Sequence, residues 1–188
     1  RLCQKGFTEI TYVGIHIASY GLDTKSKGLS DLLCEANKID GIKRLRLSSI
    51  EPMTLNEEFA LKIKDLDKLC PHFHLSLQSG CDETLKRMNR KYTTDEYYKI
   101  VEGLRHHFPE VAITTDIMVG FPGETDEEFE KTCEFTEKVA FADAHIFQYS
   151  PRPGTPAAKF ENQVLPEVKE ARSKRIMEIC RKSVRLYR

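Results

Sequence analysis

Short runs of β-prone residues alternate with longer helical patterns, and this alternation restricts the fold more than any other feature of the sequence. Consecutive runs begin about 34 residues apart, which is the size of a strand–helix–strand unit. The strand-like runs cover Glu9–Gly14, Arg44–Ser49, Phe73–Gln78, Val111–Gly120 and Ala144–Tyr149, and the helical patterns cover 29–38, 56–69, 82–107, 125–139 and 167–186. Because such crossovers are right-handed and place helices outside a parallel sheet, the sequence predicts an α/β fold with five βα units.

The length of the chain limits how far such a sheet can close. The chain has 188 residues, whereas a closed eight-stranded barrel takes about 250. We therefore predict a partial parallel (β/α) barrel over 1–165, followed by a basic C-terminal helix over 166–188. Arg1–Gly6 is typical of the end of a helix, so we expect the first strand of the barrel to be absent from this sequence.

Local signals predict where several helices begin. Thr125 and Glu128 have the spacing of a capping box. Pro166 suits the first turn of a helix, where its missing N–H group costs nothing. Asp82, which comes soon after Gly80, is predicted to cap the next helix.

The strand-like runs alternate between an apolar and a polar face. In the third run, the apolar face carries Phe73, Leu75 and Leu77, and the polar face carries His74, Ser76 and Gln78. A barrel interior used only for packing would carry Val, Ile and Leu instead. The sequence therefore predicts a hydrated interior that can hold a ligand. An open sheet with one solvated face is the alternative.

Composition excludes several classes of protein. The 29 basic and 29 acidic side chains give a net charge of zero, which argues against capture of nucleic acid by the whole surface but not by a local patch. No apolar stretch reaches the roughly 20 residues of a membrane-spanning helix. Since no secretory signal is present either, we predict a cytoplasmic protein without a membrane partner.

The six cysteines do not have the spacing of a metal site. They stand at positions 3, 34, 70, 81, 133 and 180, and no two are close enough for a C-x-x-C motif. We therefore predict no zinc or iron–sulfur site within this chain. Free thiols in a reducing compartment, packed as small apolar side chains, are the favoured interpretation.

Small and polar residues gather where the strand-like runs end, which is where ligands bind in parallel α/β folds. Gly14 and Gly120 would let a ligand lie against the backbone. Glu51 could accept a hydrogen bond from an ammonium group, and Gln78 and Ser79 could hold hydroxyl groups of the ribose type. The alternative for each position taken singly is an ordinary βα loop.

Two segments carry a local excess of basic residues. Lys86–Lys91 includes Arg90 and suits a carboxylate or a phosphate, or is simply a solvated helix end. Leu165–Arg188 has eight basic and three acidic residues, a local net charge of +5. That helix could meet an RNA backbone or lead to a following domain, and the second interpretation is favoured.

Six segments of the chain, taken in order, carry a family resemblance. They are Gly14–Gly21, Arg46–Pro52, Leu77–Asp82, Leu85–Thr93, Thr114–Thr125 and Tyr149–Ala157. Together they resemble the radical S-adenosylmethionine (SAM) domain of the MiaB-like methylthiotransferases. The Gly14–His16 start and the segment Ala112–Asp116 most resemble the branch that acts on threonylcarbamoyladenosine in tRNA, the MtaB-like enzymes.

The resemblance implies a reaction, cofactors and partners. The implied reaction adds a methylthio group to C2 of N6-threonylcarbamoyladenosine next to the anticodon. Full-length relatives use SAM and [4Fe–4S] clusters, act on tRNA with the help of an electron donor, and carry a tRNA-binding domain after the helix that matches 166–188. The alternatives are the branch acting on N6-isopentenyladenosine, a non-catalytic RNA-binding module, and a different βα-barrel enzyme that uses a metal or a Schiff base.

The resemblance also implies which residues contact SAM. These are Gly14, Ser49 and Glu51 at the methionyl end, Gln78 and Ser79 at the ribose, Gly120 at the adenine, and Arg90 beside a carboxylate. It assigns no catalytic residue and no metal ligand in this sequence.

The chain departs from the family pattern in three places. The C-x-x-x-C-x-x-C motif that holds the cluster is missing, so we expect no cluster and no radical cleavage in the segment as given. Val13 stands where the family often has Thr, which removes a hydroxyl group near the expected site. Cys81 stands where Ser is common.

Overall fold

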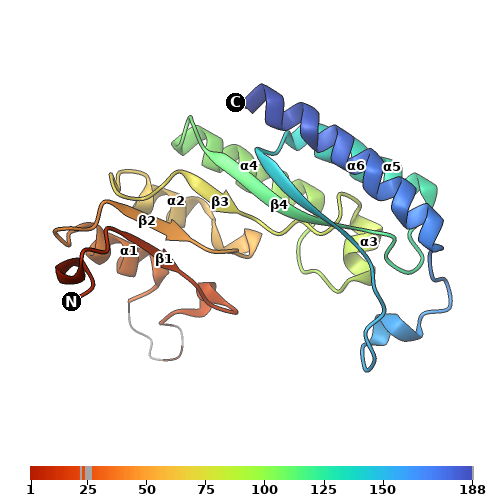
Figure 1. Cartoon of the computed structure of the whole chain (residues 1–188), viewed down its shortest axis with the longest axis horizontal. Coiled ribbons are helices and arrows are strands. Elements are labelled where there is room, and N and C mark those ends of the chain that lie inside the picture. The colour runs from red at the N-terminus through yellow and green to blue at the C-terminus, as the bar shows by residue number, and fades with distance from the viewer. Residues whose placement is uncertain (22, 24–26, 188) are drawn as a thin grey trace. The chain divides into compact units, whose positions relative to one another are not determined.

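The expected alternation of strands and helices is present in the computed structural model, which describes residues 1–21, 23 and 27–187 (Figure 1). The strands within those residues are β1 (Glu9–Tyr12), β2 (Arg44–Leu47), β3 (His72–His74), β4 (Ala112–Val119) and β5 (Asp143–Gln148). The α-helices are α1 (Leu29–Asn37), α2 (Glu57–Ile63), α3 (Asp82–Arg87), α4 (Thr94–His107), α5 (Asp126–Val139) and α6 (Pro166–Tyr187). Short 3₁₀ turns occupy Cys3–Lys5, Ile17–Ser19, Pro52–Thr54 and Pro156–Lys159.

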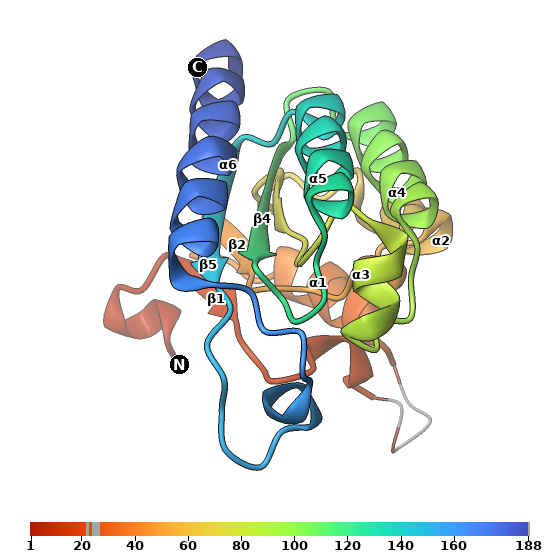
Figure 2. The same ribbon diagram turned by 90° about the vertical axis from the view of Figure 1, so that its right-hand side faces the viewer.

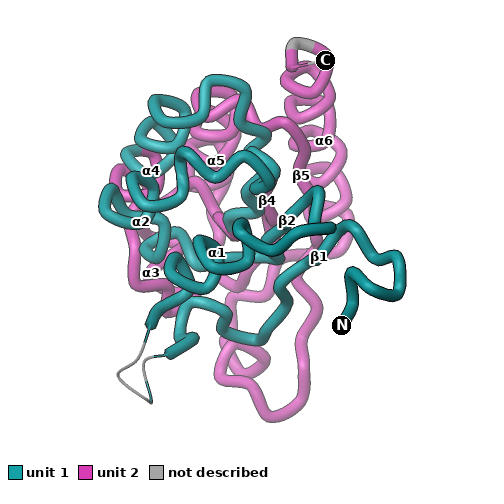
Figure 3. The backbone as a smooth tube through the Cα atoms, turned by 90° about the vertical axis from the view of Figure 1, so that its left-hand side faces the viewer, with its two compact units in different colours: residues 1–75, 99–113 teal, residues 76–98, 114–188 magenta. Residues whose placement is uncertain are grey.

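The chain divides into two compact units, which are coloured separately in Figure 3. Unit 1 comprises residues 1–75 and 99–113, and unit 2 comprises residues 76–98 and 114–188. Two elements run through both: α4 begins in unit 2 and ends in unit 1, and β4 begins in unit 1 and continues into unit 2.

Strand pairing in unit 1 is parallel. β1 pairs with β2 in a register that runs from Glu9 opposite Arg44 to Tyr12 opposite Leu47. A parallel bridge joins Ile50 to Leu75 beyond the end of β2. At the start of β4, the Ala112 N–H group donates to the carbonyl of Pro71, just before β3.

Strand pairing in unit 2 is also parallel. β4 and β5 run side by side from Thr114 opposite Asp143 to Val119 opposite Gln148. Gln78 forms a parallel bridge to Ile117 of β4. The pairings in both units confirm the predicted parallel α/β arrangement, because right-handed crossovers through helices connect strands in just this way.

Each unit has its own apolar core. In unit 1, α1 and α2 pack against each other beside β2, and the Phe73 and Phe108 rings meet edge to face at 5.4 Å. In unit 2, the buried Tyr97 ring lies 6.1 Å from Phe135 and 6.2 Å from Phe141. Helices α5 and α6 pack against each other in unit 2, and α6 also packs along β5 (Figure 2).

Two predicted helix starts are confirmed. The Thr125 side chain accepts from the Glu128 N–H group at 3.2 Å, and the Glu128 carboxylate accepts from the Thr125 N–H group at 3.1 Å, so the capping box is complete. Helix α6 begins at Pro166, as predicted.

The predicted cap at Asp82 is wrong. Cys81 is the N-cap residue of α3, and Asp82 Oδ1 instead accepts from the Thr94 N–H group at the start of α4. The single helix predicted over 82–107 is accordingly two helices. Asn89 adopts a left-handed conformation after α3, with φ of 59°, and this conformation, which Asn tolerates, ends the helix.

The strands predicted over Glu9–Gly14 and Arg44–Ser49 end slightly early, at Tyr12 and Leu47, and two other predicted elements are much shorter than expected. The helix predicted over 56–69 ends at Ile63, and the strand predicted over Phe73–Gln78 is regular only over His72–His74. Beyond β3 the backbone bonds to side chains instead of a regular ladder: the Leu77 N–H group donates to Thr115 Oγ1 at 3.0 Å, and Tyr92 Oη donates to the Leu77 carbonyl.

Gly80 allows this segment to lie directly against α5. A Cβ atom at Gly80 would lie 2.7 Å from Phe135 Cβ and 2.9 Å from Thr132 Cα. The backbone of α5 cannot move away locally, so any side chain at this position forces the segment after β3 off the helix.

Replacing Gly80 with Ala should therefore destabilise the protein by about 1–3 kcal/mol, the usual cost of overpacking. Chemical denaturation would measure the free energy of unfolding. Gly103→Ala is the matched control: Gly103 lies within α4 with its nearest neighbour at 3.8 Å, so this variant should gain roughly 0.5–1 kcal/mol from helix propensity. Equal stability of the two variants would contradict the packing argument.

All six cysteines are free thiols, and Cys81, Cys133 and Cys180 are buried. Burial raises the pKa of Cys133 to about 11 and that of Cys180 to about 11. Since the thiolate is the reactive form, these two side chains behave as small apolar groups.

Alkylation by iodoacetamide at pH 7 should therefore be at least about 100-fold slower at Cys133 and Cys180 in the folded protein than after denaturation, where a thiol pKa is near 8.5. Peptide mass spectrometry would follow each site over time. The partly exposed Cys3 and Cys70 serve as internal controls. Labelling of Cys133 at the rate of the denatured chain would show that the burial described here is wrong.

Candidate functional site

The carboxyl ends of β1 and β2 bring three predicted site residues to one edge of unit 1. Gly14 follows β1, and Ser49 and Glu51 follow β2; all three are exposed. His16 Nε2 lies 3.3 Å from Glu51 Oε2, and the two side chains are 50% and 63% exposed. The sequence predicted no role for the His16 side chain and did not reveal this pair, because only the register of β1 on β2 places the two residues together.

The same edge has features that internal packing does not require. An added Cβ at Gly14 would lie 3.6 Å from its nearest neighbour, which is ordinary contact, so the fold of unit 1 does not demand a glycine there. Ser48 Oγ is buried and has no hydrogen-bond partner among the described residues. An orphaned hydroxyl group next to an open edge of this kind fits a polar ligand.

Two residues with left-handed backbone lie at the corresponding edge of unit 2. Gln78 has φ of 70° and Gly120 has φ of 73°. Gln78 is held by two backbone hydrogen bonds of 2.8 Å, from its N–H group to Asp116 and from the Met118 N–H group to its carbonyl. A non-glycine residue in this conformation costs about 1–3 kcal/mol and is typical of functional sites.

Ser79 is fully buried rather than facing the edge. Its Oγ lies 3.2 Å from Thr132 Oγ1 and accepts from the Cys81 N–H group at 3.3 Å. These bonds hold the backbone immediately after Gln78 against α5. The residue type alone could not show which way the hydroxyl group turns.

Arg90 is exposed in the turn between α3 and α4, where its N–H group donates to the Leu85 carbonyl. Within the described part of the chain, its guanidinium forms no ion pair. It is therefore available to a carboxylate or a phosphate.

A hollow of about 440 Å³ lies at the ends of β4 and β5. Its lining residues are Met118, Phe147, Gln148, Tyr149, Ser150, Arg152, Thr155 and Ala157. The Phe147 ring is 51% exposed, which is unusual for a large aromatic side chain on a strand. The sequence predicted no site residue here; the available signal is that Phe147 falls on the same strand face as the polar residues Asp143 and His145.

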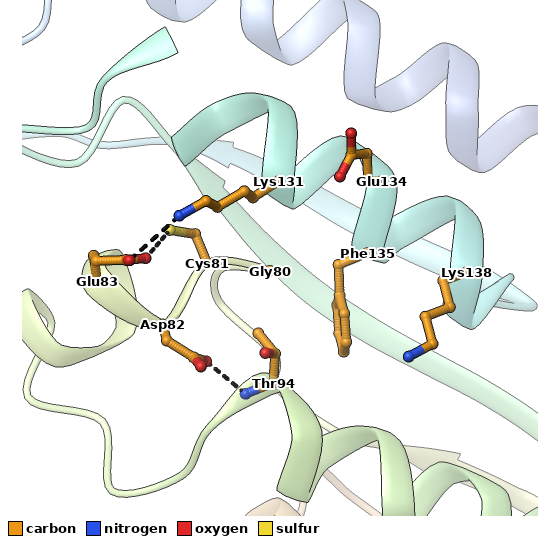
Figure 4. A pocket seen from close by; sticks show the side chains of 9 residues that line it. All are labelled: Gly80, Cys81, Asp82, Glu83, Thr94, Lys131, Glu134, Phe135 and Lys138. Carbon is orange, nitrogen blue, oxygen red and sulfur yellow. Dashed lines mark hydrogen bonds and ion pairs between the residues drawn. The ribbon is translucent and has the colours of Figure 1, made fainter. Parts of the chain in front are cut away.

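A second hollow in unit 2, of about 340 Å³, lies between α3, the start of α4 and α5 (Figure 4). Two of its charged side chains, Glu83 and Lys131, already pair with each other. Glu83 accepts from Cys81 Sγ at 2.9 Å and from Lys131 Nζ at 3.3 Å, and these bonds lower the pKa of Glu83 to about 2. None of the predicted site residues lines it, so it is not a candidate for the site.

The described residues contain no group of three or more His, Cys, Asp or Glu side chains placed to hold a metal ion. They also contain no helix that is both long and apolar enough to cross a membrane.

Comparison with known proteins gives concordant results for sequence and fold. The chain is 47% identical over 169 residues to "Threonylcarbamoyladenosine tRNA methylthiotransferase MtaB" of Thermotoga maritima, covering 90% of this chain and 38% of that protein. It is 45% identical over 178 residues to "tRNA-2-methylthio-N(6)-dimethylallyladenosine synthase" of Acetivibrio thermocellus, covering 94% and 37%. The chain thus spans less than half the length of these relatives.

Among solved structures, the chain resembles coproporphyrinogen III oxidase (HemN) of Escherichia coli, described as a radical SAM enzyme. The TM-score is 0.71 at 15% identity, over 94% of this chain and 40% of that one. This likeness concerns the fold alone, and it confirms the predicted partial parallel (β/α) barrel type. The sequence family described as the Radical SAM superfamily matches residues 4–136, well over half of the chain. The chain therefore belongs to the radical SAM superfamily.

Proposed function

We propose that the protein containing this chain is a tRNA methylthiotransferase that adds a methylthio group to C2 of an N6-modified adenosine next to the anticodon. One observation carries the proposal: over at least 90% of its length, the chain is 45–47% identical to two enzymes whose names describe methylthiolation of a modified adenosine in tRNA. The proposal includes tRNA and an electron donor as partners, and a cytoplasmic location where tRNA is available.

The finer proposal is that N6-threonylcarbamoyladenosine is the substrate. The segment Gly14–His16 resembles the branch that acts on this nucleoside. The exposed imidazole of His16 also gives the edge of unit 1 a polar group, which suits a substituent that carries carboxylate and hydroxyl groups better than a hydrocarbon one. The alternative substrate is N6-isopentenyladenosine, which the similarity to the dimethylallyladenosine enzyme supports.

We propose SAM as the ligand of the strand ends. In unit 1, Glu51 would accept from its ammonium group, and Gly14 and Ser49 would lie beside the methionyl chain; the orphaned Ser48 hydroxyl group supports a polar ligand there. Bound SAM, with a [4Fe–4S] cluster, supplies the radical chemistry. The described residues include no group of side chains placed to hold a cluster. We therefore assign them no step that involves a cluster.

In unit 2, the proposal assigns Gln78 to the ribose hydroxyl groups and the Gly120 backbone to the adenine. Ser79 would act as a positioning residue, because its buried hydrogen bond to Thr132 fixes the backbone after Gln78. Arg90 would pair with a carboxylate. In this proposal, these residues bind and orient SAM. The fixed left-handed backbone at Gln78 and Gly120 favours such a role.

The proposed domain organisation follows from the same resemblance. Residues 1–165 form the radical SAM domain, and 166–188 form a basic helix that leads toward a tRNA-binding domain; Arg188 lies outside the described residues.

Nucleoside analysis tests the activity and the choice of substrate together. Deleting the gene of the natural protein should abolish 2-methylthio-N6-threonylcarbamoyladenosine in digested tRNA, with accumulation of its unthiolated precursor, as measured by mass spectrometry. Loss of the isopentenyl derivative instead would establish the alternative substrate. If both nucleosides kept their normal levels, the proposed activity would be wrong.

Substitution of Glu51 tests the SAM assignment. Glu51→Gln should raise the dissociation constant for SAM about tenfold, because a charge-assisted hydrogen bond contributes roughly 1.5–3 kcal/mol and 1.4 kcal/mol is a factor of ten. Calorimetry on the anaerobically purified natural protein would measure it. Glu57→Gln is a matched control, since Glu57 forms a similar pair with His107 at 2.8 Å but lies at the start of α2. Equal affinities of both variants would contradict the assignment.

A further inference from the structure

Helix α6 reaches the ends of β4 and β5 through the side chain of Lys169. A Cβ atom at Gly120 would overlap Lys169 Cγ and would lie 2.7 Å from Lys169 Cδ, so the aliphatic stem of Lys169 lies directly on the Gly120 backbone. The ammonium group continues past Gly120, where Nζ donates to the Tyr149 carbonyl at 3.0 Å. One side chain thus joins the residue after β4 to the residue after β5.

Arg172, about one turn further along α6, contacts the same turn through Glu124. Its Nη1 donates to the Glu124 carbonyl at 3.1 Å and to Glu124 Oε2 at 2.7 Å, and its Nη2 donates to Asp126 Oδ1 at 2.8 Å. The same Glu124 Oε2 accepts from the Gly120 N–H group at 2.7 Å. A continuous chain of hydrogen bonds therefore runs from α6 through Glu124 to Gly120.

This network is buried. The side chain of Glu124 is fully buried and that of Arg172 is 7% exposed. Burial raises the pKa of Glu124, while the Gly120 N–H group and the Arg172 guanidinium act in the opposite direction by stabilising the carboxylate. Removal of either partner of a buried pair of this kind would leave the other as an uncompensated buried charge.

Helix α6 has other contacts that dock it to unit 2. Ile176, Ile179 and Cys180 are buried further along the helix. Arg175 also pairs with Glu130 of α5, with Nη1 2.6 Å from Oε2, on the exposed side. Because these contacts also hold the helix, the contacts of Lys169 and Arg172 have a further, more local consequence: they fix the turn at Gly120.

We propose that Lys169 and Arg172 are positioning residues that hold the Gly120 turn and the end of β5 in the conformation that binds the adenosine part of SAM. The proposal rests on the proposed function, which places the adenine at Gly120. A turn that is already fixed loses little conformational freedom when the ligand binds, so the protein binds the ligand more tightly. Lys169 and Arg172 act through Gly120, Glu124 and Tyr149 and need no contact with SAM.

The test uses Lys169→Met in the natural protein, since methionine keeps most of the aliphatic stem but removes the bond to Tyr149. We expect the dissociation constant for SAM to rise at least about tenfold, the lower end of the range for a lost hydrogen bond to a charged group. Amide hydrogen exchange of residues 118–124 and 147–150, measured without SAM, should become faster. The thermal midpoint should stay close to that of the unsubstituted protein.

Arg172 requires a paired substitution, because removing it alone leaves a buried carboxylate without its partner. The double variant Arg172→Met with Glu124→Gln removes both charges and should fold, but it should also bind SAM more weakly and exchange faster at 118–124. Arg175→Gln is the matched control: it removes an ion pair of α6 with α5 that does not touch the strand ends, so SAM affinity and exchange should be unchanged.

The outcomes separate this proposal from the proposed function. Tight binding of SAM by Lys169→Met and by the double variant, with unchanged exchange at 118–124, would overturn the positioning role alone. If Arg175→Gln weakened SAM binding to the same extent, the positioning role would also be wrong, because any loosening of α6 would then be enough to weaken binding. If the unsubstituted natural protein did not bind SAM, the proposed function and this proposal would both be wrong.

Discussion

Parallel pairing between neighbouring strands is the constraint on which the rest of each unit depends. Two parallel strands end at the same edge of a sheet, so residues far apart in sequence come together there. In unit 1 the pairing of β1 with β2 brings His16 to Glu51. In unit 2 the pairing of β4 with β5 puts Gly120 and Tyr149 within reach of a single lysine side chain. A slip of one residue in either register would turn the polar face into the core.

The strand ends of unit 2 show how a binding edge is kept rigid without regular secondary structure. Beyond β3, the backbone is held by side chains: Thr115 accepts from Leu77, Tyr92 donates to the same residue, and Ser79 bonds to Thr132. Together these bonds hold Gln78 in its left-handed conformation. Without them, the free-energy cost of that conformation would favour an ordinary extended strand. A buried serine in this segment is therefore as important to the edge as an exposed one.

Features set by local chemistry could be predicted from the sequence, whereas features set by contacts across the fold could not. The capping box of Thr125 and the start of α6 at Pro166 depend on neighbouring residues and are confirmed. The break between α3 and α4 had two local signals that were missed, namely Asn89 and the capping-box spacing of Thr93 and Glu96. The packing of Gly80 on α5, the buried hydroxyl group of Ser79 and the pairing of His16 with Glu51 all depend on partners more than 30 residues away, which no periodicity reveals.

The basic residues of α6 also show that contacts across the fold, which the sequence does not reveal, decide what a residue does. A count of charge treats them alike, as an attraction for RNA or as part of a helix that leads to a following domain, but their surroundings differ. The Arg175–Glu130 pair is half-exposed, and such pairs contribute little to stability because water screens them. The Arg172–Glu124 pair is buried, yet within the described residues Arg172 Nε and Glu124 Oε1 have no partner. Apolar residues of similar volume often stabilise a core as well as a pair that is only partly satisfied. Stability is therefore a weak explanation for buried charge at this position, and control of the Gly120 turn, which the pair contacts directly, is a stronger one.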